Sequence, residues 1–102
     1  MKFDKLVRDK IPEIIKKKGK QVSTHQADQQ EYLIKLTDKL QEEVDEFMAD
    51  QNLEELADIL EVIQALCELM GYKYADLEKL RLNKKNDRGG FRQQIILDEV
   101  KD

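Results

Sequence analysis

The chain has 102 residues, of which 39% are charged and 40% are apolar, and its formal net charge is −4. This balance excludes a disordered composition, and the acidic excess argues against a nucleic-acid binder, which needs a basic face to displace counterions from phosphates. The single cysteine allows no internal disulfide, and neither a signal peptide nor an apolar run of membrane-spanning length is predicted. We therefore expect residues 1–102 to form one cytoplasmic domain with no nucleic-acid or membrane partner.

The low content of glycine and proline predicts long helices and few turns, because the sequence has only four glycines and one proline. Proline suits the first turn of a helix, so we expect a short helix over Pro12–Lys18 that Gly19 ends. Residues 20–26 read as a connection and are too short to predict a strand.

Asp28 begins a long segment with one apolar stripe. Residues spaced three and four apart lie on one face of a helix, and the apolar residues of this segment follow that spacing. They are Leu33, Leu36, Leu40, Val44 and Phe47. Residues 50–52 (Asp-Gln-Asn) interrupt the pattern, so the helix should end there.

The next predicted helix, Leu53–Met70, is apolar nearly all round and ends at Gly71. From residue 56 onward its polar residues are Asp58, Glu61, Gln64 and Glu68. A helix of this kind is normally buried on most sides, and one short chain cannot surround it. We therefore expect a homodimer or a larger bundle.

A third main helix is predicted from Tyr74 to about Asp87, and two glycines at 89–90 end it. Basic residues on one face near its end would suit phosphate oxygens, although cations at a helix C-terminus are also ordinary partners of the helix dipole. They are Arg81, Lys84 and Arg88. The form of the tail, Phe91–Asp102, is not predicted by its pattern.

Two acidic pairs flank the interruption at residues 50–52. Glu43 and Glu46 are three apart on one helix, and Glu55 and Asp58 are three apart on the next, so each pair can bind one cation. A short connection makes the two helices antiparallel neighbours, which would bring the pairs together. Glu42 lies one turn before Glu46 and joins the cluster.

Four carboxylates with no cysteine or histidine nearby favour Mg²⁺ or Mn²⁺ over Zn²⁺. Such sites commonly bind substrate phosphates as well. In a chain this rich in charge, however, acidic pairs also arise on solvated helix faces, and spacing alone leaves the two interpretations equally open.

The acidic pattern, Glu-Glu-Val-Asp-Glu at 42–46 followed by Glu-Leu-Ala-Asp at 55–58, resembles the EExxE…ExxD signature of the all-alpha NTP pyrophosphatase superfamily. That group includes MazG, dimeric dUTPases and phosphoribosyl-ATP pyrophosphohydrolase. The opening Lys-Leu-Val-Arg-Asp-Lys-Ile-Pro-Glu-Ile-Ile at 5–15 and the closing Asp-Arg-Gly-Gly-Phe at 87–91 are similar to the short, MazG-like house-cleaning members. The resemblance covers nearly the whole chain.

The resemblance implies an all-α, antiparallel helical bundle, assembled as a homodimer or a dimer of dimers, with Mg²⁺ (or Mn²⁺) between the acidic helices. It implies hydrolysis of a nucleoside triphosphate to the monophosphate and pyrophosphate, as nucleotide-pool house-cleaning. The residue roles that it implies form one set: metal ligands Glu43, Glu46, Glu55 and Asp58; catalytic residues Glu42, Glu43 and Glu46, among which the general base stays open; and substrate-binding residues Asn83, Lys84 and Arg88.

Two alternatives stay open. One is a non-catalytic helical dimer that binds nucleotides or a protein partner, which the apolar Leu53–Met70 helix would serve equally well. The other is a phosphoribosyl-ATP pyrophosphohydrolase. The stretch between Glu46 and Glu55 is shorter than in that enzyme or in MazG proper, so base and sugar specificity cannot be transferred from those relatives.

Overall fold

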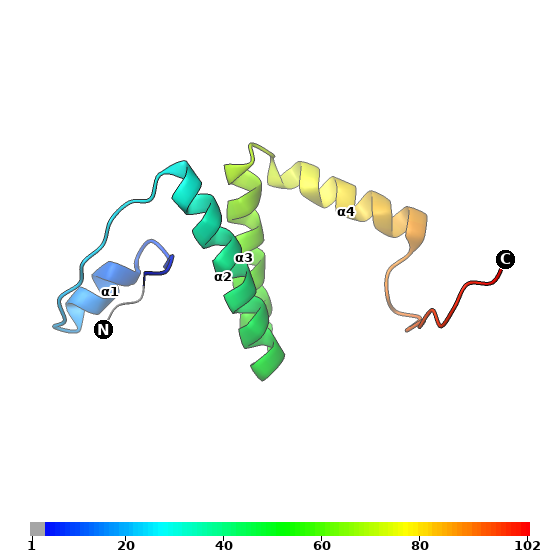
Figure 1. The fold of residues 1–102 in the computed structure, drawn as a ribbon, viewed down its shortest axis with the longest axis horizontal. Helices are drawn as coiled ribbons and strands as arrows, with labels where there is room; N and C mark the ends of the chain where they lie inside the picture. The colour runs from blue at the N-terminus through cyan, green and yellow to red at the C-terminus, as the bar shows by residue number, and fades with distance from the viewer. Residues whose placement is uncertain (1–3) are drawn as a thin grey trace.

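The computed structural model describes residues 4–102, which form four α-helices and no β-strand (Figure 1). The all-α class predicted from the sequence is confirmed. The helices, each within one residue of its predicted bounds, are α1 (Ile11–Lys17), α2 (Gln29–Asp50), α3 (Leu53–Leu69) and α4 (Tyr74–Arg88).

Helices α2 and α3 form an antiparallel hairpin, as expected, because only two residues separate them. Gln51 adopts a left-handed conformation, with φ 49°, and its N–H donates to the carbonyl of Phe47 at 2.7 Å. Asn52 then caps α3, since its side-chain oxygen accepts a 3.0 Å hydrogen bond from the backbone N–H of Glu55. The link thus ends one helix and starts the next without a loop.

The buried core is small and lies between these two helices. Leu36 of α2 is 2% exposed, and Val62 and Cys67 of α3 are also buried. The thiol of Cys67 donates to the carbonyl of Tyr72 at 3.5 Å, in the turn that leaves α3. Leu33, at the start of the predicted stripe, stays 40% exposed, so the hairpin covers only part of its own apolar surface.

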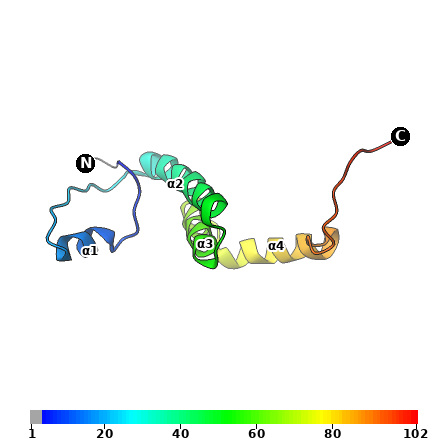
Figure 2. The ribbon, with the colours of Figure 1, turned by 90° about the horizontal axis from the view of Figure 1, so that it is seen from below.

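Helix α4 extends away from the hairpin, and α1 lies on the opposite side of it (Figures 1 and 2). No residue of α4 is buried. The radius of gyration is 18.2 Å, whereas a compact chain of about 100 residues has about 13 Å. The chain is therefore open, with its helices spread over 62 × 32 × 24 Å.

The tail after α4 forms no helix or strand over residues 91–102. Its conformation was not predicted by the sequence pattern. Five large apolar side chains along it are exposed to solvent: Phe91, Ile95, Ile96, Leu97 and Val100. Among the described residues, no helix combines the length and the apolar character that crossing a bilayer requires.

Candidate metal centre

Three carboxylates from the two hairpin helices converge on one point. Glu43 lies on α2, and Glu55 and Asp58 lie in the first two turns of α3. Each can offer one oxygen to a common position, and these oxygens lie within 4.8 Å of one another. The tight link brings the three together, because it places the start of α3 beside the last turns of α2.

Two oxygens of this cluster are buried without a hydrogen-bond donor. They are Oε2 of Glu43 and Oε2 of Glu55. Glu43 is only 6% exposed, so water does not solvate it as it would a surface carboxylate. A buried carboxylate oxygen without a partner destabilises the fold, and a cation bound by the cluster would offset the negative charge of both glutamates. The all-oxygen donor set suits a hard cation such as Mg²⁺.

Glu46 lies beside the cluster but outside it, on an exposed part of α2. The negative charge of Glu43 is the main cause that raises the pKa of Glu46. Burial raises the pKa of Glu55, and the charges of Glu46 and Asp58 raise it further. These shifts show a crowded negative site, in which the ionised carboxylates repel one another.

Three basic side chains partly neutralise this charge. Lys39 Nζ lies 3.1 Å from Oε1 of Glu43. Lys5 Nζ lies 3.2 Å from Oε1 of Glu42, and a guanidinium nitrogen of Arg8 lies 2.7 Å from Oδ1 of Asp58. Each of the three acidic residues therefore has a cation close to one oxygen.

The same contacts shift the titration of Lys39 and Glu42. Burial lowers the pKa of Lys39, but hydrogen bonding to Glu43 and the charges of both glutamates raise it overall. Burial raises the pKa of Glu42, but Lys5 and Lys39 outweigh burial and lower it. The two groups therefore stay charged at neutral pH.

Sequence reasoning had assigned no role to Lys5, Arg8 or Lys39. The position of Lys39 could have been predicted from the sequence, because a lysine four residues before Glu43 lies on the same face of α2. Lys5 and Arg8 contact residues 37 and 50 positions away, and no periodicity within a helix could have located them.

The predicted substrate-binding residues lie elsewhere in the chain. Asn83, Lys84 and Arg88 are exposed on the distal half of α4, which points away from the acidic hairpin (Figures 1 and 2). Arg81, on the same helix, is bound by both carboxylate oxygens of Glu78. One chain alone does not bring these residues to the carboxylates.

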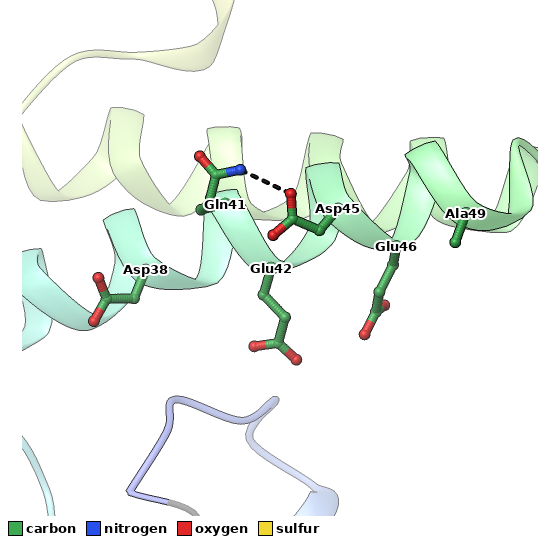
Figure 3. A pocket seen from close by; sticks show the side chains of 6 residues that line it. All are labelled: Asp38, Gln41, Glu42, Asp45, Glu46 and Ala49. Atoms are coloured by element: carbon green, nitrogen blue, oxygen red, sulfur yellow. Dashed lines mark hydrogen bonds between the residues drawn. The ribbon is translucent and has the colours of Figure 1, made fainter.

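A shallow groove of about 510 Å³ runs along the outer side of α2 (Figure 3). Glu42 and Glu46 line it and point in the same direction from the helix, while Gln41 donates a 2.9 Å hydrogen bond to Asp45 at its other side. Its lining comes from α2 alone and does not include the three converging carboxylates. The groove therefore borders the candidate centre, and the cluster between α2 and α3 is the better place for an ion.

Comparisons with protein-family models, with curated proteins and with solved structures found no match to this chain.

Proposed function

We propose that the chain is a Mg²⁺-dependent nucleoside triphosphate pyrophosphohydrolase, which converts a nucleoside triphosphate and water to the monophosphate and pyrophosphate. The observation that supports it most is the convergence of Glu43, Glu55 and Asp58 on one point, with two buried oxygens that lack a donor. The acidic motif at 42–46 and 55–58 supplies the reaction class by its resemblance to the all-alpha NTP pyrophosphatases.

In this proposal Glu43, Glu55 and Asp58 hold Mg²⁺, and Glu46 joins them by turning its exposed side chain inward. The ion, when bound, neutralises phosphate charge and lowers the pKa of a water molecule. Glu42, Glu43 and Glu46 are the candidates for the base that takes the proton of the attacking water. Glu42 and Glu46 point in the same direction from α2 (Figure 3). Glu42 shares the cation of Lys39 with Glu43, and the charge of Glu43 raises the pKa of Glu46, so both side chains lie near the cluster.

We further propose that the working form is a homodimer or a dimer of dimers. Leu53, Leu56 and Leu60 of α3 are 82%, 48% and 49% exposed, and they lie on the helix that carries two of the proposed ligands. The open shape of the single chain leaves this surface uncovered. A second copy that packs on α3 would bury it and could bring its own α4 towards the carboxylates.

A non-catalytic helical dimer is the second candidate. Arg8 and Lys39 already pair with Asp58 and Glu43, as cations would in a purely structural site. These pairs leave Oε2 of Glu43 and Oε2 of Glu55 without a donor, however, and a scaffold has no use for that arrangement. The metal-binding interpretation therefore accounts for more of the site.

The test is pyrophosphate release from a panel of canonical, deoxy and damaged nucleoside triphosphates and phosphoribosyl-ATP, with Mg²⁺ or with EDTA. We expect release that needs Mg²⁺, is lost in Glu43→Gln and is retained in the control Asp45→Asn, which removes an exposed carboxylate from the same helix. Release from phosphoribosyl-ATP alone would select that enzyme class. A folded protein that releases pyrophosphate from no substrate would overturn the proposal in favour of the binding dimer.

A further inference from the structure

The segment before α1 is attached to both helices of the hairpin by polar contacts. Lys5 binds Glu42 of α2 and Arg8 binds Asp58 of α3. Lys35 of α2 donates a 2.8 Å hydrogen bond to the backbone carbonyl of Asp4. These contacts place residues 4–8 beside the converging carboxylates, although the segment has no helix or strand of its own.

Arg8 has more hydrogen-bond donors than its contact with Asp58 uses. A guanidinium carries five N–H donors in a planar fork, which matches two oxygens of a phosphate. The structure shows one of its terminal nitrogens on Asp58, and the side chain is 56% exposed. The side chain of Lys5 is 45% exposed beside Glu42. Both cations can thus be reached from solvent at the edge of the cluster.

A nucleotide bound at the proposed metal site would need such cations. Its phosphates would add negative charge beside Glu42, Glu43, Glu46, Glu55 and Asp58, and one divalent ion does not balance that total. In the same chain helix α4, with its basic residues, extends away from the hairpin (Figure 1), whereas Lys5 and Arg8 already contact the acidic residues.

We propose that Lys5 and Arg8 are phosphate-binding residues, which pair with Glu42 and Asp58 before the substrate arrives and with the phosphate chain of the nucleotide afterwards. When Asp58 ligates the ion, Arg8 would exchange this carboxylate for the phosphate chain of the nucleotide. The exchange keeps each cation paired throughout. This inference deepens the proposed function and rests on it.

The test is the affinity for inorganic pyrophosphate at saturating Mg²⁺, measured by calorimetry, together with KM and kcat for the best nucleotide. Losing a hydrogen bond between charged groups weakens binding roughly 10- to 100-fold, so we expect Arg8→Gln to raise both the pyrophosphate Kd and KM by that factor. Lys5→Gln should act in the same direction, and Arg8→Lys should recover part of the loss. Lys10→Gln, which removes an exposed cation from the same segment, is the matched control and should leave both constants unchanged.

The alternative is that Arg8 only neutralises Asp58 in the absence of the ion. In that case Arg8→Gln would change the affinity for Mg²⁺ alone, and pyrophosphate at saturating Mg²⁺ would bind as it does to the wild type, which would overturn the inference. Wild-type hydrolysis with an unchanged KM in Arg8→Gln and Lys5→Gln would overturn it too, and the proposed function would stand. A wild-type protein that binds no pyrophosphate with Mg²⁺ also refutes it. If the wild type binds pyrophosphate through Arg8 but hydrolyses no nucleotide, only the catalytic proposal fails.

Discussion

The α2–α3 hairpin and the α4 arm with its tail pack very differently. The hairpin buries Leu36, Val62 and Cys67 and brings three carboxylates together, whereas no residue of α4 is buried. The hairpin also begins its second helix with a side-chain cap at Asn52, while Lys73 at the start of α4 provides no such cap.

This difference shows which part of the proposed site a single chain can form and which part it cannot. The acidic half of the site forms within the hairpin, because a two-residue link forces α2 and α3 together. Lys39 of α2 and the segment around Arg8 supply cations that already contact the acidic residues, whereas one chain leaves the basic residues at the far end of α4 in solvent. Five experiments challenge or refine this division.

The largest effect should come from the first turn of α3. Glu55→Gln removes a proposed ligand, and we expect pyrophosphate release to fall at least about 100-fold, at the upper end of what disturbing a metal site costs. Glu54→Gln is the matched control, since it removes the neighbouring carboxylate, which is exposed and outside the cluster. Equal activity of the two variants in a pyrophosphate-release assay would remove Glu55 from the site.

Assembly should depend on the exposed apolar surface of α3. Leu60→Glu places a charge where we expect a second copy to pack, and a charge buried without a partner destabilises an interface. The molar mass measured by light scattering should fall from a multiple of 12.0 kDa to that of one chain. Gln26→Glu, in the exposed connection before α2, should leave the mass unchanged. A wild-type protein that is already monomeric contradicts the assembly proposal.

Metal should stabilise the hairpin in proportion to its binding. At a Mg²⁺ concentration of 100 times Kd the free energy of unfolding rises by about 2.7 kcal/mol, which for a domain of this size raises Tm by about 10–20 °C. Differential scanning fluorimetry in Mg²⁺ and in EDTA at matched ionic strength measures the shift. Glu43→Gln should abolish it, and a wild-type Tm that does not respond to Mg²⁺ would argue that the carboxylates bind no ion.

Mixing two inactive or weakened chains tests whether α4 serves the site of a partner. Arg88→Gln should raise KM roughly tenfold if it removes one phosphate contact. If Arg88 acts on the partner's carboxylates, coexpression with Glu55→Gln regenerates about a quarter of the sites in a random mixture of dimers. Activity at low substrate should then exceed the mean of the two parents. A mixture that only averages them would place Arg88 outside the partner's site.

The smallest effects concern the helix caps. Asn52→Ala removes the cap of α3 and should lower the free energy of unfolding by about 1 kcal/mol. Lys73→Asp offers α4 the cap that it lacks and should raise this free energy by a similar or smaller amount. Urea denaturation of both variants measures the pair. A larger effect at Lys73 than at Asn52 would mean that α4, not the hairpin, limits stability.

Local sequence predicted the helices well because their ends are local events. Asp28 and Asn52 cap helices through their own side chains, and Gly71 adopts the positive φ of 79° that ends α3. The meeting of Glu43 with Glu55 and Asp58 also followed from the shortness of one link.

The features that the sequence did not predict depend on contacts between segments that are distant in the chain. The positions of Lys5 and Arg8 depend on how residues 4–10 fold back onto the hairpin, and no helical spacing encodes that path. The direction in which α4 leaves the hairpin is not encoded in its own helical pattern. Glu46 is exposed and lies outside the cluster, whereas Glu43, three residues earlier on the same helix, is buried within it.

The ion pairs of Lys39 and Arg8 also bear on whether the hairpin folds before or after it binds a metal ion. Small metalloproteins with no internal counter-charge stay unfolded until the metal arrives, because the binding free energy is their folding free energy. In this chain the cations of the protein itself offset much of the repulsion, so the hairpin can form first. The proposed ion would then bind a preformed site. The protein could release and rebind the ion repeatedly without unfolding.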